Sequence, residues 1–282
     1  MQGANKAILV TWDFTEVSKN AFLYALKIAK TVENDIQILN IVKPGHPELL
    51  KKAKEKLTKE AFRLKGEFKW PVSALILEGS IFTAVSKYVN KDSINMVVMG
   101  THGIKGSQKF FGSFALKVII GSEVPFIVVQ GKPNHPDRIS NIIFPVDHKS
   151  ENKEKLQWAI YLSKYFNSRI LLFKMPLSDK LLLKRLNTNL NFAIRFLIQN
   201  NIDYEIHTAT GRGNFGKQIL AFADESNADL ILITTTKNIT IFDFLFSAPE
   251  QYIMANASGI PVMCINPRAS FIKMGQFMYG TS

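Results

Sequence analysis

The sequence predicts an α/β fold of two domains, each with a five-stranded, mostly parallel sheet sandwiched by helices. Short, nearly continuous apolar runs alternate with segments of helical length, a pattern typical of parallel strands covered on both faces. The pattern also repeats once along the 282 residues, at an offset of 134 positions. A single repeat of this length indicates two copies of one domain rather than a solenoid.

In the first copy the expected strands are residues 7–12, 36–42, 72–77, 94–99 and 126–130. Between the second and third of these, apolar residues recur every three to four positions among lysines, at Ala53, Leu57, Ala61 and Leu64. This spacing predicts an amphipathic helix over 51–65 with a solvated basic face. A nucleic-acid patch is the alternative, and it is disfavoured because a single aromatic residue, Phe62, lies among the basic side chains, too few to stack a run of bases.

In the second copy the expected strands are residues 141–146, 169–175, 203–209, 229–234 and 261–266. Asp13 aligns with Asp147, Ala25 with Ala159 and Gly79 with Gly213. The predicted domains are residues 1–132 and 139–267, joined through a linker rich in proline, glycine and charge ("GKPNHPDR"). Residues 268–282 form a tail with no copy in the first half.

Charge and cysteine content narrow the possible classes of protein. The net charge is +12, and residues 1–135 carry 19 basic and 11 acidic side chains against 16 and 12 in the rest. Such an excess attracts anions. The lone Cys264 excludes an internal disulfide framework and suits a reducing, cytoplasmic compartment, where we expect it to be a buried core residue. We expect no signal peptide and no membrane span.

A glycine-rich stretch, "MGTHGIKGSQKFFGSFALK", follows the fourth strand of the first copy. Gly100 and Gly103 come directly after the strand, and Gly112 and Ser113 come directly before a helical pattern. Glycines let the backbone approach a ligand, and the free N–H groups of a helix start favour an anion such as a polyphosphate. Ser113 can cap the helix or donate to a phosphate, with Lys105 and Lys109 nearby. A flexible connection without a ligand is equally consistent with this spacing.

The chain resembles the universal stress protein family in its tandem two-domain form. The resemblance rests on the internal repeat together with the stretches "ILVTWDFTE" and "VVMGTHGIKGSQKFFGSFALKVI". The resemblance implies Rossmann-like domains of the adenine nucleotide alpha hydrolase type, arranged as a pseudo-dimer. The last strand of each copy would be an apolar edge, so we expect these two strands to pair within one chain. The glycine spacing, Gly100-x2-Gly103-x8-Gly112-Ser113, is one residue shorter than the G-x2-G-x9-G-[ST] of the family's ATP-binding members.

The resemblance also implies a ligand: ATP or another adenine nucleotide, with or without Mg²⁺, in the first domain. The implied binding residues are Thr11, Trp12, Asp13, Ile41, Met99, Gly100, Gly103, Gly112, Ser113, Phe114 and Ala115. Two of them have other possible roles. Asp13 can instead cap the first turn or helix, and Trp12 is large enough to crowd the adenine pocket.

The second copy lacks this loop. At the same offset Gly100 becomes Thr234, Gly103 becomes Lys237 and Gly112 becomes Phe246, whereas the serine persists as Ser247. Each replacement adds a side chain where backbone would have to approach phosphate. We therefore expect at most one nucleotide per chain. The glycine-rich "GRGNFG" at 211–216 is too irregular for a dinucleotide fingerprint and is a weaker candidate anion site.

No catalytic or metal-binding constellation emerges from the sequence. The five histidines and the single cysteine have no metal-ligand spacing, and no Walker-type lysine follows a glycine loop. The predicted function is a stress-response regulatory or binding protein that binds an adenine nucleotide. A nucleotide-free protein-interaction module of the same fold is the alternative, and a slow ATPase is less favoured. A homodimer or another protein partner is possible; we expect neither nucleic acid nor a membrane as a partner.

Overall fold

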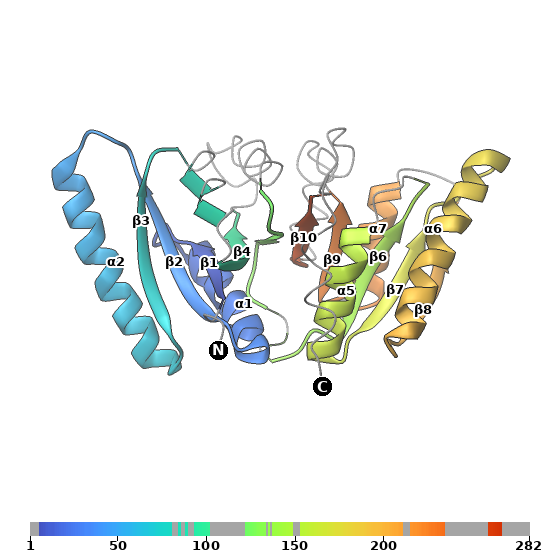
Figure 1. Cartoon of the computed structure of the whole chain (residues 1–282), viewed down its shortest axis with the longest axis horizontal. Helices are drawn as coiled ribbons and strands as arrows, with labels where there is room; N and C mark the ends of the chain where they lie inside the picture. Colours follow the sequence, from blue (N-terminus) through green and yellow to red (C-terminus); the bar gives the residue numbers. More distant parts are fainter. Residues whose placement is uncertain are drawn as a thin grey trace.

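A computed structural model describes residues 6–80, 84–85, 88–89, 93–101, 122–133, 135, 137–148, 153–210, 215–234 and 259–266 (Figure 1). The strands of the first half are β1 Ala7–Thr11, β2 Asp35–Val42, β3 Val72–Glu78, β4 Ile94–Gly100 and β5 Phe126–Val129. Those of the second half are β6 Asn141–Val146, β7 Arg169–Lys174, β8 Tyr204–Thr208, β9 Leu230–Thr234 and β10 Val262–Ile265. The long helices are α1 Glu16–Val32, α2 Pro47–Phe68, α5 Lys153–Phe166, α6 Lys180–Gln199 and α7 Phe215–Glu225. All ten expected strands are present.

The ten strands form one sheet in the order β3-β2-β1-β4-β5-β10-β9-β6-β7-β8. The second half repeats the strand order of the first in reverse, and pairing within each half is parallel. The two halves meet through an antiparallel pair, in which Phe126 of β5 lies opposite Cys264 of β10. The predicted pairing of the two terminal strands is confirmed, and the halves form a pseudo-two-fold arrangement.

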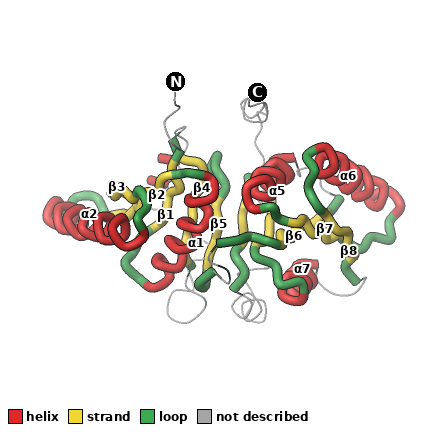
Figure 2. The backbone as a smooth tube through the Cα atoms, turned by 90° about the horizontal axis from the view of Figure 1, so that it is seen from below, coloured by secondary structure: helices red, strands yellow, loops and turns green. Residues whose placement is uncertain are grey.

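The sheet has a helical layer and a separate buried cluster on each face. Helices α1 and α5 lie next to one another at the centre of the molecule (Figure 1). Around β6 to β8, α5 and α6 cover one face and α7 covers the other (Figure 2). Successive β1 residues alternate between the two faces: Ile8 and Val10 join one cluster, and Leu9 joins the other.

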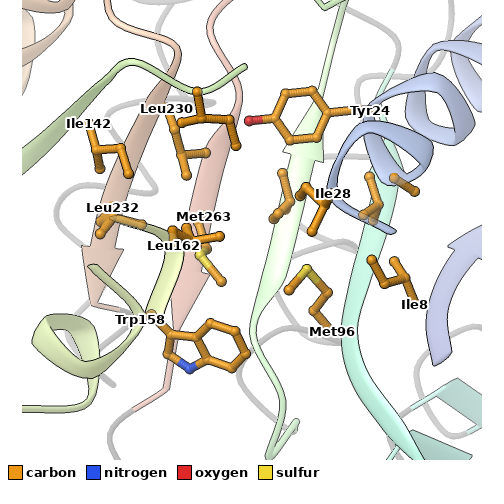
Figure 3. Packing of buried hydrophobic residues seen from close by; sticks show 14 of the residues in the cluster. Ile8, Tyr24, Ile28, Met96, Ile142, Trp158, Leu162, Leu230, Leu232 and Met263 are labelled. Atoms are coloured by element: carbon orange, nitrogen blue, oxygen red, sulfur yellow. The ribbon is translucent and has the colours of Figure 1, made fainter. Parts of the chain in front are cut away.

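The cluster under α1 and α5, which we call the shared core, takes residues from both halves of the chain (Figure 3). Its members include Ile8, Tyr24, Ile28 and Met96 from the first half and Ile142, Trp158, Leu162, Leu230, Leu232 and Met263 from the second. The cluster on the other face includes Leu9, Val97, Met99, Phe126, Ile143, Leu220, Ile231 and Cys264, so the predicted burial of Cys264 is confirmed. Burial of apolar surface therefore stabilises the contact between the halves as well as the fold of each half.

Polar contacts also join α1 to the second half. The Tyr24 hydroxyl donates to the Asp229 carbonyl (3.3 Å), and Lys27 Nζ donates to the Arg138 carbonyl (3.2 Å). The Asp229 carboxylate accepts hydrogen bonds from the backbone N–H groups of Ser140 (2.7 Å) and Asn141 (3.2 Å). These three side chains, Tyr24, Lys27 and Asp229, are thus hydrogen-bonded at the seam between the halves.

Helix α2 has the solvated basic face predicted for this segment. It buries Leu57, Ala61 and Leu64, while its lysines lie outward. Among the helices that the structure describes, none combines the length and apolar character needed to cross a bilayer.

Candidate functional site

The strand order of the first half marks a candidate site at the carboxyl ends of β1 and β4. From β1 the chain passes through α1 to β2 on one side, whereas β4 and β5 lie on the other side. In open α/β sheets, ligands bind where the strand order changes direction in this way. The structure places Thr11 and Asp13 at the end of β1 and Gly100 at the end of the neighbouring β4.

The turn after β1 is built on Asp13. One carboxylate oxygen, Oδ1, accepts hydrogen bonds from the Thr15 backbone N–H (3.0 Å) and from the Thr15 hydroxyl (2.5 Å). Thr15 in turn caps α1 by accepting from the Ser18 N–H (3.4 Å). Asp13 thus caps the turn, which is one of the two roles that the sequence allowed for it. Its side chain is also exposed at the strand end.

Phe14, the next residue, has a left-handed backbone with φ 65°. A bulky side chain disfavours this conformation, at a cost of about 1 kcal/mol or more. The ring is partly buried against the shared core, edge-on to Trp12 at 6.4 Å between centroids. Lys56 of α2 places its ammonium over the ring, 3.8 Å from the centroid. Trp12 and Lys56, from two separate parts of the chain, therefore both contact this strained residue.

Trp12 lies in the shared core. Its side chain is 2% exposed and packs edge-on against both Phe14 and Phe22. Its backbone N–H donates to the Leu39 carbonyl (2.7 Å), and its carbonyl accepts from Asn40 Nδ2 (2.7 Å). The buried ring does not crowd the surface at the strand ends.

Gly100 is a glycine for a packing reason that the sequence did not reveal. A Cβ atom built on it would lie 2.6 Å from both the Cγ1 atom and the carbonyl oxygen of Val17, in the first turn of α1. The close approach of α1 to the end of β4 therefore requires a residue without a side chain. Of the other predicted residues here, Met99 is fully buried in the cluster opposite the shared core, and Ile41 is partly buried against the same cluster.

The remaining predicted site residues, Gly103, Gly112, Ser113, Phe114 and Ala115, lie outside the described residues. The phosphate-binding loop therefore remains a prediction from the sequence. The same holds for the second-half counterparts Lys237, Phe246 and Ser247, and for most of the "GRGNFG" stretch.

The equivalent strand end in the second half contains a buried lysine that sequence reasoning missed. Lys155 of α5 donates from Nζ to the Pro145 carbonyl of β6 (2.6 Å) and lies 4.3 Å from the Phe144 ring centroid. Burial lowers the pKa of Lys155 to about 8, although the nearby Asp147 opposes the shift. The repeat offset aligns Lys155 with Ala21, which is fully buried. This alignment is the feature of the sequence from which burial of Lys155 could have been predicted. The second strand end thus has a buried lysine where the first has a buried alanine.

The buried lysine predicts a specific pH dependence of stability. Its pKa is about 8 in the folded chain and 10.5 ordinarily, so the unfolded chain binds more protons between these values. The free energy of unfolding should therefore rise by about 1 kcal/mol between pH 7 and pH 9 on account of Lys155. Urea unfolding at both pH values measures this rise, and Lys155→Met should lack it.

Lys27 adds a rise of the same sign, because burial lowers its pKa to about 8 as well. The Lys155→Met variant should therefore keep the part due to Lys27, and Lys27→Met should keep the part due to Lys155. An unchanged pH dependence in Lys155→Met would contradict the assigned burial of its ammonium group.

Metal ligands do not gather in the described ranges: no group of three or more histidine, cysteine, aspartate or glutamate side chains there is placed to hold a metal ion. What the geometry offers is an exposed carboxylate beside a helix start, at a change in strand order.

Comparison with known proteins identifies the first half. Residues 4–130 match the universal stress protein family, which confirms the predicted family for this part of the chain. Universal stress protein MJ0531 of Methanocaldococcus jannaschii is 27% identical over 139 residues, covering 44% of this chain and 82% of that protein.

Two solved structures show that the fold extends over both halves. A universal stress protein from Archaeoglobus fulgidus superimposes with a TM-score of 0.72 at 17% identity, covering 93% of this chain and 97% of that one. A putative universal stress protein from Pseudomonas aeruginosa gives a TM-score of 0.57 at 14% identity, covering 94% of each chain.

Proposed function

We propose that the universal stress protein domain formed by residues 4–130 binds ATP or a related adenine nucleotide at the carboxyl ends of β1 and β4. The observation that carries the proposal is the change of strand order between these two strands, with the exposed Asp13 at one end and the glycine-rich segment leaving the other. Asp13 would face the ribose or the base. Residues Gly103, Gly112, Ser113, Phe114 and Ala115 would surround the phosphates.

The second half would be a degenerate copy of the same domain, over residues 139–267, that binds no nucleotide. The substitutions Thr234, Lys237 and Phe246 support this asymmetry, because each adds a side chain where backbone would have to approach phosphate. The shared core supports a structural role, because the second half covers surface that the first half would otherwise expose. The chain would act as a regulatory binding protein. Its cytoplasmic location, any homodimer and any slow ATP hydrolysis remain predictions.

Isothermal titration of the full chain with ATP, with and without Mg²⁺, tests the proposal. We expect a stoichiometry near one nucleotide per chain. Binding should also stabilise the folded chain, by about 2.7 kcal/mol at a hundredfold excess over the dissociation constant. A stoichiometry near two would contradict the asymmetry. No detectable binding would favour the nucleotide-free interaction module.

Matched substitutions locate the site within the chain. Ser113→Ala should weaken ATP binding about 10- to 100-fold, because it removes a hydroxyl that would donate to a charged phosphate. Ser247→Ala makes the same change at the equivalent position of the second half and should leave affinity unchanged. Gly112→Phe copies Phe246 and should abolish binding while the chain stays folded. Equal effects of the two serine substitutions would place the site elsewhere.

A further inference from the structure

The turn between β1 and α1 has a feature that its counterpart in the second half lacks. Left-handed residues recur at matching places in the two halves: Glu33 (φ 55°) follows α1 and Asn167 (φ 53°) follows α5. Phe14 (φ 65°) breaks the symmetry, because its counterpart His148 is not among the residues with positive φ. The strained conformation therefore belongs to the half with the candidate ligand site.

The strain at Phe14 has an identifiable geometric result. The left-handed residue turns the chain between Asp13 and Thr15, so that one carboxylate oxygen of Asp13 accepts both the N–H and the hydroxyl of Thr15. Phenylalanine does not favour this conformation, so its surroundings must hold it. The described contacts that do so are the edge-on Trp12 ring and the Lys56 ammonium 3.8 Å from the Phe14 centroid.

We propose that Phe14 is a positioning residue: its ring, held between Trp12 and Lys56, keeps the turn in the left-handed conformation that fixes the Asp13 carboxylate for an adenine nucleotide. The ligand part of this inference rests on the proposed function, whereas the turn part does not. Lys56 contributes through its charge above the ring face, a cation–π contact that extends from the basic helix α2 to the site.

Hydrogen exchange of the Thr15 amide, measured without nucleotide, tests the turn. Phe14→Ala keeps the steric penalty of a side chain but loses the ring, so Thr15 exchange should accelerate at least tenfold. Phe14→Gly also loses the ring but adopts positive φ freely, so exchange should accelerate less than in Phe14→Ala. Phe14→Tyr retains the ring and should match the unsubstituted chain. Phe68→Ala, a control that removes another partly buried ring from the shared core, should leave Thr15 exchange unchanged.

Titration of the same variants with ATP tests the ligand part. Affinity should fall about tenfold in Phe14→Ala, less in Phe14→Gly and not in Phe14→Tyr or Phe68→Ala. If Phe14→Gly is as damaging as Phe14→Ala in both measurements, the ring acts through apolar contact alone and the inference is overturned. If the exchange results hold but the unsubstituted chain binds no ATP, the proposed function fails and the turn mechanism stands without its ligand.

Discussion

Gly100→Ala is expected to lower the free energy of unfolding by about 3 kcal/mol. The added methyl group would lie 2.6 Å from the Val17 carbonyl oxygen and 2.9 Å from its carbonyl carbon. Both are backbone atoms, so relief requires moving the first turn of α1 or the end of β4. Contacts this short cannot be relaxed by rotating a side chain, which is why the cost exceeds that of ordinary overpacking.

Gly66→Ala is the matched control for this substitution. Gly66 lies within α2, and a Cβ atom there would have nothing within 4 Å. Alanine is favoured over glycine in a helix interior, so this variant should gain about 0.5–1 kcal/mol of stability. Urea denaturation of both variants shows whether the free energy of unfolding falls in Gly100→Ala and rises in Gly66→Ala. Equal stabilities for Gly100→Ala and the unsubstituted chain would show that α1 does not approach β4 this closely.

The expected instability also affects how binding data on Gly100 should be read. A loss of ATP affinity in Gly100→Ala would follow from displaced packing alone, because Val17 stands one residue past the start of α1. Ser113 and Gly112 are better probes of ligand contact, since their proposed roles rest on the loop and not on this helix approach.

Most of the ten strands were predictable because they are short apolar runs that the sheet buries, although the edge strand β8 is mostly exposed. The pairing of β5 with β10 could be expected because both runs are apolar and end a copy of the repeat, and because the resemblance to the universal stress protein family implies pairing through this strand. Periodicity likewise predicted that α2 would bury Leu57, Ala61 and Leu64 and leave its lysines in solvent.

The site was less predictable, because its geometry depends on contacts between residues that are distant in sequence. The glycine at position 100 suggested a ligand, but its described constraint is Val17, 83 positions earlier in the chain. The left-handed Phe14 carries no signal in composition, since phenylalanine rarely adopts positive φ. The burial of Lys155 was missed for the same reason. A lysine in a helix is normally exposed, and its burial against Phe144 depends on tertiary packing.

Met263→Lys should destabilise both halves of the chain, by about 3–5 kcal/mol in total. Met263 is fully buried in the shared core, on the central strand β10 opposite Ile127 of β5 (Figure 3). The side chains around it in the shared core are apolar, so the charge of a lysine there would be desolvated at the seam. Met263→Leu conserves volume and should cost less than about 1.5 kcal/mol.

Native-state hydrogen exchange shows whether the loss is shared between the halves. Because the shared core joins α1 and β4 to α5, β9 and β10, amides of β1 in the first half should lose protection together with those of β6 in the second. The reason is that separating the halves would expose Tyr24, Ile28 and Met96 on one side of the seam and Trp158 on the other (Figure 3). If β1 keeps its full protection in Met263→Lys while β6 loses it, the halves are stable independently, and the second half is not needed to support the proposed nucleotide site.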